Sequence, residues 1–198
     1  GVDTEALAEA GGHLDATITV KFEDQGKTVA NDMLSRLPDG GQVAILQGLA
    51  GAGQNEGRTK GATEVFEAAE KIDMVASIPC DWDATLAYDT TKDLITEYPD
   101  LKGIFACNDT MALAAVEALQ AEGKTDVLVY GVDFTEDARA AIKEGTMTGS
   151  MSYSSAKYTT AALKMALKLA NGETFDGNVY LPLTLVTVDN VNDLDGWK

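Results

Sequence analysis

The region covering residues 102–153 constrains the fold most, because short apolar runs alternate there with segments of helical periodicity. Three apolar runs predict buried strands: Ile104–Ala106, Val127–Val132 and Met147–Ser152. Two segments between them have apolar residues at helical spacing and end at a glycine: Asp109–Glu122 and Glu136–Glu144. Strands that alternate with helices in this way predict a parallel sheet covered by helices.

The same alternation continues toward the N-terminus and completes the predicted sheet. Two further apolar runs predict strands: Val43–Leu46 and Met74–Ile78. Three segments predict helices: Lys27–Leu37, a segment that follows the glycine-rich loop Gly48–Gly57, and Ala84–Tyr98. Five strands joined by right-handed crossovers predict a doubly wound α/β fold with the strand order 2-1-3-4-5. We expect this sheet to form a complete lobe over residues 20–153.

Amphipathic segments on both flanks of this lobe have no sheet of their own to cover. They are a helix at Thr4–Ala10, a helix at Ser155–Ala170 and a strand at Val179–Val188. A helix with an apolar stripe buries that stripe against another element. We therefore predict that residues 1–19 and 154–184 are parts of a second, incomplete lobe, whose uncovered faces could pair in a dimer of this truncated chain.

The composition argues against several classes of partner. The formal net charge is −17 and 45% of the residues are apolar, so the chain can build a core but lacks a basic face for nucleic acid or anionic membrane. No apolar run could span a bilayer, and no signal peptide is visible in the chain. The two cysteines, Cys80 and Cys107, follow different strands with another strand between them, which predicts two free thiols.

Polar side chains follow several predicted strands at their carboxyl ends, which is where open parallel sheets bind small ligands. Asn108, Asp133 and Tyr153 each occupy such a position. Asn and Asp there equally serve as N-caps of the next helix. Asp109 and Thr135 are better placed to cap, which leaves Asn108 and Asp133 for a ligand. Together these side chains suggest a pocket that holds a hydroxylated molecule without transforming it.

The glycine-rich loop Gly48–Gly57 and Trp82 are expected at the same edge of the sheet. The loop resembles a dinucleotide-binding G-x-G-x-x-G motif, but Glu56 stands at the third glycine position and no acidic residue ends the next strand. We favour a flexible loop that places Asn55 and Glu56 within reach of a ligand. The Trp82 ring could stack on the apolar face of a sugar, or it could pack against its own loop.

No catalytic or metal site is predicted. His13 is the single histidine and has no partner nucleophile. The acidic stretch Asp189–Gly196 lacks the spacing and the closing glutamate of a calcium loop, so we expect a solvated tail there.

Several stretches of this sequence resemble the type I periplasmic sugar-binding proteins, and most closely the ribose-binding proteins. They are GIFACNDTMALAAVEAL, VLVYGVD, AIKEGTMTGSMSYS, VAILQGLAG and AALKMALKLANGE. The resemblance implies two α/β lobes joined by three crossings, with the ligand clamped between them. It also implies that this chain is the C-terminal two-thirds of such a protein, in which residues 185–198 form a hinge crossing and the tail.

The resemblance assigns ligand contacts by position. Four residues match the family's sugar contacts: Asp3, Trp82, Asn108 and Asp133. Tyr153 stands where the family has a glutamine, and Thr4 and Glu56 replace two arginines, with Arg58 two positions further on. These departures put ribose in doubt and favour another pentose, a polyol or a ligand with an amine. Whether Glu56 or Arg58 faces the ligand stays open at this point.

The predicted function is that of a solute-binding protein, not an enzyme, that needs no cofactor. It would capture a neutral sugar or polyol in the periplasm and deliver it to the permease of an ABC transporter. One alternative is the effector-binding domain of a lac-repressor-type regulator, which has the same fold and would need an upstream helix-turn-helix. A Rossmann-type oxidoreductase is less favoured, because the glycine motif is broken and no proton-transfer pair is present.

Overall fold

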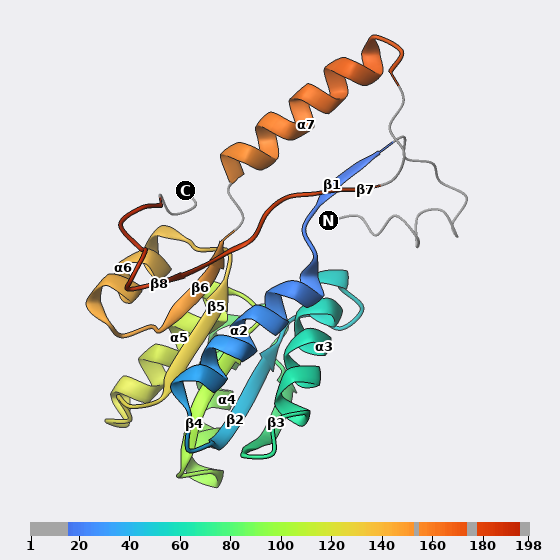
Figure 1. Ribbon diagram of the computed structural model, residues 1–198. Helices are drawn as coiled ribbons and strands as arrows, with labels where there is room; N and C mark the ends of the chain where they lie inside the picture. Colours follow the sequence, from blue (N-terminus) through green and yellow to red (C-terminus); the bar gives the residue numbers. More distant parts are fainter. Residues whose placement is uncertain (1–15, 153–154, 174–177, 195–198) are drawn as a thin grey trace.

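A computed structural model of the chain describes residues 16–152, 155–173 and 178–194, and its largest element is a six-stranded sheet (Figure 1). In spatial order the strands are β3 (Ile72–Pro79), β2 (Gly41–Gln47), β4 (Leu101–Ala106), β5 (Leu128–Val132), β6 (Gly149–Ser152) and β8 (Thr184–Thr187). The first five are parallel, and β8 runs antiparallel to β6 at the edge. The predicted order 2-1-3-4-5 is confirmed for the five strands to which it was applied.

Helices cover both faces of this sheet. They are α2 (Phe22–Arg36), α3 (Gly53–Glu67), α4 (Ala84–Glu97), α5 (Asp109–Ala121) and α6 (Glu136–Glu144). Helix α2 packs against α3 on one face, and α4 packs against α5 on the other (Figure 1). The apolar runs of the strands are buried between these layers, and Ile45, Phe105 and Tyr130 have no exposed surface. The doubly wound α/β prediction is therefore confirmed.

Two helix starts differ from the prediction. Helix α2 begins at Phe22 rather than Lys27. It contains Gly26 at the point where α3 passes so close that a side chain would not fit, because a Cβ on Gly26 would lie 2.0 Å from the Arg58 carbonyl oxygen. Helix α3 begins at Gly53, so the predicted loop over residues 48–57 is shorter than expected and its second half is helical.

A smaller group of elements lies beside the main sheet, and we call it the outer region: β1 (Thr17–Thr19), β7 (Asn178–Tyr180) and α7 (Ser155–Ala170). Strands β1 and β7 pair in parallel as a separate two-stranded sheet. The Tyr158 hydroxyl of α7 donates to the Ile18 carbonyl oxygen and ties the helix to this sheet. The predicted helix Thr4–Ala10 lies outside the described residues.

The single strand predicted at Val179–Val188 is wrong, because the structure has two strands there. Strand β7 belongs to the outer sheet and β8 to the main sheet, and the chain between them crosses from one sheet to the other (Figure 1). Leu181 still donates its N–H to the Thr19 carbonyl oxygen, whereas Pro182 has no N–H to continue a ladder.

The residues after β8 fold back onto the main sheet. The Asn190 side chain donates to the Leu185 carbonyl oxygen and accepts from the Thr187 N–H. Val191 is 1% exposed and its carbonyl oxygen accepts a bond from Arg139. The prediction of a solvated tail is therefore wrong at Val191. No helix within the described ranges has the length and apolar character needed to cross a membrane.

Candidate functional site

Six polar or aromatic residues lie around the carboxyl ends of the parallel strands, and we call them the strand-end site: Asn55, Arg58, Trp82, Asn108, Asp109 and Asp133. Helices α3, α4, α5 and α6 each begin at this edge because each follows a parallel strand. Asn55, Trp82, Asn108 and Asp133 are thus brought to one edge, as the strand order predicts. Two further predicted contacts, Asp3 and Tyr153, lie outside the described residues, as does His13.

Trp82 lies in the short loop between β3 and α4. Asp81 and Trp82 both have positive φ angles, 52° and 65°, and Asp83 then caps α4 by accepting from the Leu86 N–H at 2.8 Å. The half-buried indole packs directly over Gly48 at the end of β2, where a Cβ would lie 2.1 Å from the ring. One part of the ring therefore packs against its neighbouring loop, and the rest remains open to solvent.

Asn108 caps helix α5, and this corrects one prediction. Its side-chain oxygen accepts a bond from the Met111 N–H at 2.9 Å, so the cap is Asn108 and not Asp109. The amide nitrogen of Asn108 has no protein partner among the described residues. The cap uses the acceptor of this side chain and leaves its donor at the edge of the sheet.

Asp133 sits in a strained loop between β5 and α6. Its φ angle is 111° and that of the buried Phe134 is 56°, a region that costs a residue with a side chain about 1–3 kcal/mol. Thr135 caps α6 by accepting from the Ala138 N–H, as predicted. The Asp133 side chain is 22% exposed, and its carboxylate lies 3.7 Å from the Arg58 guanidinium.

Arg58 rather than Glu56 points into the strand-end site. Glu56 is exposed, and its carboxylate accepts from the Gly51 N–H at 3.1 Å. The Arg58 guanidinium is buried and donates to the Gln25 side-chain oxygen at 2.8 Å and to the Cys107 carbonyl oxygen at 2.7 Å. Sequence reasoning left open which of the two faces the ligand, because it placed Glu56 in a loop; in the structure both residues belong to α3, and the helix turns Glu56 away.

Asn55 lies on the same face of α3 as Arg58, one turn earlier. Its side-chain oxygen accepts from the Gly48 N–H at 2.6 Å, and the residue is 3% exposed. The contact fastens the end of β2 to the start of α3. Asn55 thus shapes the loop beneath the Trp82 ring.

Asp109 is the functional candidate that sequence reasoning treated only as a cap. Its side chain has no exposed surface; one oxygen accepts from the Ser150 hydroxyl and the other from the Thr135 N–H, both at 2.7 Å. Burial raises the pKa of the Asp109 carboxyl to about 7, and the charge of Asp133 acts in the same direction. The hydrogen bonds from Ser150 and Thr135 oppose this rise.

The two cysteines are free and buried, as predicted. Burial raises the pKa of the Cys107 thiol to about 11 and also raises that of Cys80, so both remain protonated and poorly nucleophilic. Within the described ranges, no cluster of three or more His, Cys, Asp or Glu side chains could hold a metal ion.

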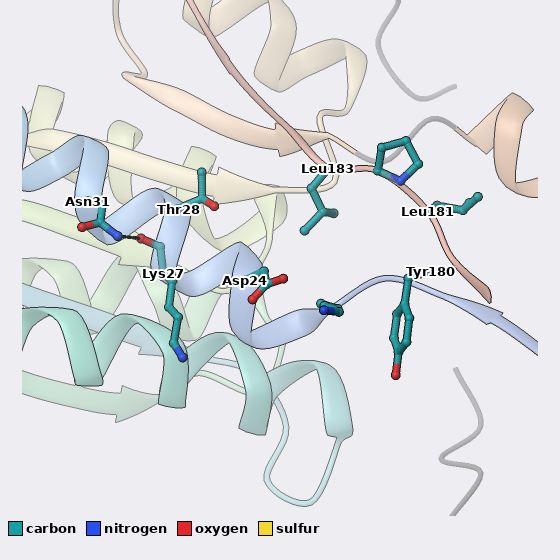
Figure 2. A pocket seen from close by; sticks show the side chains of 9 residues that line it. Asp24, Lys27, Thr28, Asn31, Tyr180, Leu181 and Leu183 are labelled. Carbon is teal, nitrogen blue, oxygen red and sulfur yellow. Dashed lines mark hydrogen bonds between the residues drawn. The ribbon is translucent and has the colours of Figure 1, made fainter. Parts of the chain in front are cut away.

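A cavity of about 600 Å³ lies between α2 and the crossing from β7 to β8 (Figure 2). Its lining includes Lys21, Asp24 and Lys27 on one side and Tyr180 and Leu183 on the other. The Lys21 ammonium lies 5.5 Å from the centre of the Tyr180 ring. The cavity therefore borders the chain crossings and does not include the strand-end site.

A family model described as a periplasmic binding protein domain matches residues 2–174. The D-allose-binding periplasmic protein of Escherichia coli is 37% identical over 83% of this chain and 53% of its own length. The ribose import binding protein of Salmonella typhimurium is 34% identical over 81% of this chain and 54% of its own length. The chain thus spans about half the length of these curated relatives.

Two solved structures of solute-binding proteins have a similar fold. A periplasmic solute-binding protein of an ABC transporter from Actinobacillus succinogenes, with bound D-allose, has a TM-score of 0.91 and 29% identity over 98% of this chain and 68% of that chain. A solute-binding protein from Bacillus halodurans, with bound myo-inositol, has a TM-score of 0.86 and 25% identity over 96% of this chain and 71% of that chain.

Proposed function

This chain belongs to the periplasmic binding protein domain family, and from that premise we propose that it is part of a solute-binding protein for a neutral sugar or polyol. The ligand would be held between two lobes in the periplasm, released unchanged, and delivered to the permease of an ABC transporter. Residues 20–153 would supply one complete lobe. Residues 1–19 and 154–184 would supply part of the second, with 185–198 as the last crossing and the tail.

The observation that carries the proposal is the position of backbone strain. Among the described residues, the non-glycine residues with positive φ are Asp81, Trp82, Asp133 and Phe134. They form two pairs in two loops at the same edge of the sheet, and each pair contains one of the proposed ligand contacts. Such strain persists only where the surrounding structure enforces it, and it clusters at active sites and ligand clamps.

The side chains at this edge offer what a neutral hydroxylated ring needs. The Asp133 carboxylate accepts hydrogen bonds from hydroxyls, the Asn108 amide nitrogen donates one, and the Trp82 ring can stack on C–H groups. The Arg58 charge is opposed by Asp133 at 3.7 Å, so this pair does not present an uncompensated cation to an anionic ligand. We propose Asp3 and Tyr153 as further contacts, and Asn55 and Glu56 as residues that shape the loop at the rim.

A ligand screen tests this proposal on the chain and on a version extended upstream to the length of its relatives. D-allose, ribose, xylitol and myo-inositol are compared with a sugar acid and a sugar phosphate by thermal shift and calorimetry. At least one neutral compound should stabilise the extended protein, and Asp133→Ala should weaken that binding by about ten-fold or more.

The matched control is Asp126→Asn, a change at an exposed carboxylate paired with Lys102 far from this edge. It should leave affinity unchanged. Stabilisation by the acid or the phosphate, and by nothing neutral, would show that Arg58 reads an anion and would overturn the proposal.

A further inference from the structure

We infer that Asp109 is a positioning residue for ligand binding: its buried carboxylate holds the Asp133–Phe134 loop in the left-handed conformation that directs Asp133 to the ligand. This inference rests on the proposed function and deepens it. Asp109 itself does not contact the ligand. It acts through the backbone of the neighbouring loop and through Ser150 on β6.

The contacts of Asp109 join three successive segments of the sheet edge. Asp109 begins α5 directly after β4, Thr135 follows β5, and Ser150 lies in β6. One carboxylate oxygen accepts from the Thr135 N–H and the other from the Ser150 hydroxyl, both at 2.7 Å. A single side chain therefore fixes the strained loop to the elements on both sides of it.

The direction of the hydrogen bonds is fixed along this chain of contacts. The Phe134 N–H donates to the Ser150 oxygen at 3.0 Å, so the Ser150 hydroxyl proton is free to point at Asp109. Both groups that face the carboxylate are thus donors, which an ionised carboxylate can accept together. A protonated Asp109 has one oxygen that must itself donate, so it cannot satisfy both donors in the same arrangement.

The carboxylate occupies space that a side chain at Gly131 would otherwise fill. A Cβ on Gly131 of β5 would lie 2.3 Å from the Asp109 oxygen and 2.8 Å from the terminal carbon of Met147. The absence of a side chain at Gly131 is therefore what admits the carboxylate between β5 and β6. The Asp133 N–H, in turn, donates to the Met151 carbonyl oxygen at 2.9 Å, so the loop is fastened on either side of its strained residues.

The positioning role of Asp109 can be tested by changing its protonation state. Two charged groups lie near the Asp109 carboxyl. Asp133 on the β5–α6 loop opposes its ionisation, and Arg58 of α3 lies beside Asp133. From β6, the Ser150 hydroxyl faces the carboxyl. Because burial raises the pKa of Asp109 to about 7, the carboxylate changes charge near neutral pH. We expect sugar affinity to fall as the pH decreases from about 8 to about 6.

The first measurement follows backbone amides and needs no ligand. Hydrogen exchange of the Thr135 and Phe134 amides is compared in the wild type, Asp109→Asn, Ser150→Ala and the control Asp126→Asn. Asp109→Asn should speed exchange at Thr135 by about ten-fold or more, and Ser150→Ala should do so at Phe134. The control should match the wild type. Unchanged exchange in both variants would overturn the inference.

The second measurement is D-allose affinity against pH in the extended protein. Asp109→Asn should weaken binding by about three- to ten-fold near pH 8 and abolish the inflection near pH 7, because its side chain does not titrate. An inflection that persists in Asp109→Asn would overturn the inference. A protein that binds no sugar would contradict the proposed function instead, and the amide measurement would still decide whether Asp109 holds the loop.

Discussion

The main sheet and the outer region are built from the same kinds of elements, yet they differ in how well their apolar surfaces are covered. In the main sheet the apolar residues of the strands lie between two layers of helices. In the outer region, Leu163 and Leu167 of α7 are 62% and 58% exposed, and Tyr180 of β7 is 49% exposed. An amphipathic pattern therefore specifies a helix and its face, but the covering of that face depends on further elements.

The comparison predicts a large difference in the cost of truncating an apolar side chain. Phe105→Ala in β4 should lower the free energy of unfolding by about 3–5 kcal/mol, because Phe105 is fully buried. Leu163→Ala should change it by less than about 0.5 kcal/mol. Urea unfolding followed by circular dichroism measures both. Equal losses would mean that the two regions unfold as one equally packed unit.

The buried carboxylate of the main sheet predicts a pH dependence of stability. The folded pKa of Asp109, about 7, lies above its ordinary value, so the folded state binds the extra proton between about pH 4 and pH 7. The contribution of Asp109 to the free energy of unfolding should therefore fall as the pH rises through this window, by roughly 2–4 kcal/mol.

Asp109→Asn should remove this component from the stability profile, while Asp126→Asn at an exposed position should retain it. The two profiles are obtained from denaturant unfolding at several pH values. A difference between wild type and Asp109→Asn that stays constant with pH would contradict the assignment.

The close contact between α2 and α3 predicts a smaller effect at a glycine. Gly26→Ala should cost about 1–3 kcal/mol, because its Cβ would meet α3 backbone atoms of Arg58 and Ala62. Gly53→Ala is the matched control at the start of α3, where nothing lies within 4 Å of the added carbon. Thermal unfolding of both variants measures the difference, and a loss of stability only at Gly53 would be the opposite result.

The exposed leucines of α7 predict an effect on association rather than on stability. Leu163→Asp combined with Leu167→Asp should leave the free energy of unfolding within about 0.5 kcal/mol of the wild type and should reduce self-association of the chain. Sedimentation at graded concentrations compares this variant with Leu86→Asp, which changes an exposed leucine of the main sheet region. Equal self-association in all three proteins would exclude α7 as the contact surface.

The order of the strands was predictable from sequence, whereas the site was predictable only in part. Apolar runs such as Val43–Leu46 and the handedness of crossovers determine which strands are neighbours. The direction of Arg58 and Glu56 was not predictable, because it depends on the residue at which α3 begins. Three glycines precede Glu56 in this segment and a fourth follows it directly, a pattern that predicts a loop until the packing of α2 against α3 is known.

Asp109 shows a second limit of sequence reasoning. A polar pair such as Asn108 and Asp109 before a helix predicts that one residue caps it, and either choice satisfies the pattern. The structure assigns the cap to Asn108 and buries Asp109 against β6. This arrangement requires the missing side chain of Gly131, a contact from a strand that lies elsewhere in the sequence.

The pairing of β1 with β7 has a consequence for the order of folding. The Tyr158 hydroxyl and the Ile18 carbonyl that it contacts are separated by 140 residues, and nearly the whole main sheet lies between them in sequence. Closing so long a loop in an unfolded chain is entropically unfavourable, and a folded intervening lobe removes most of that cost by bringing its two ends together. We therefore expect the lobe to act as a template, with the outer strands pairing late in folding.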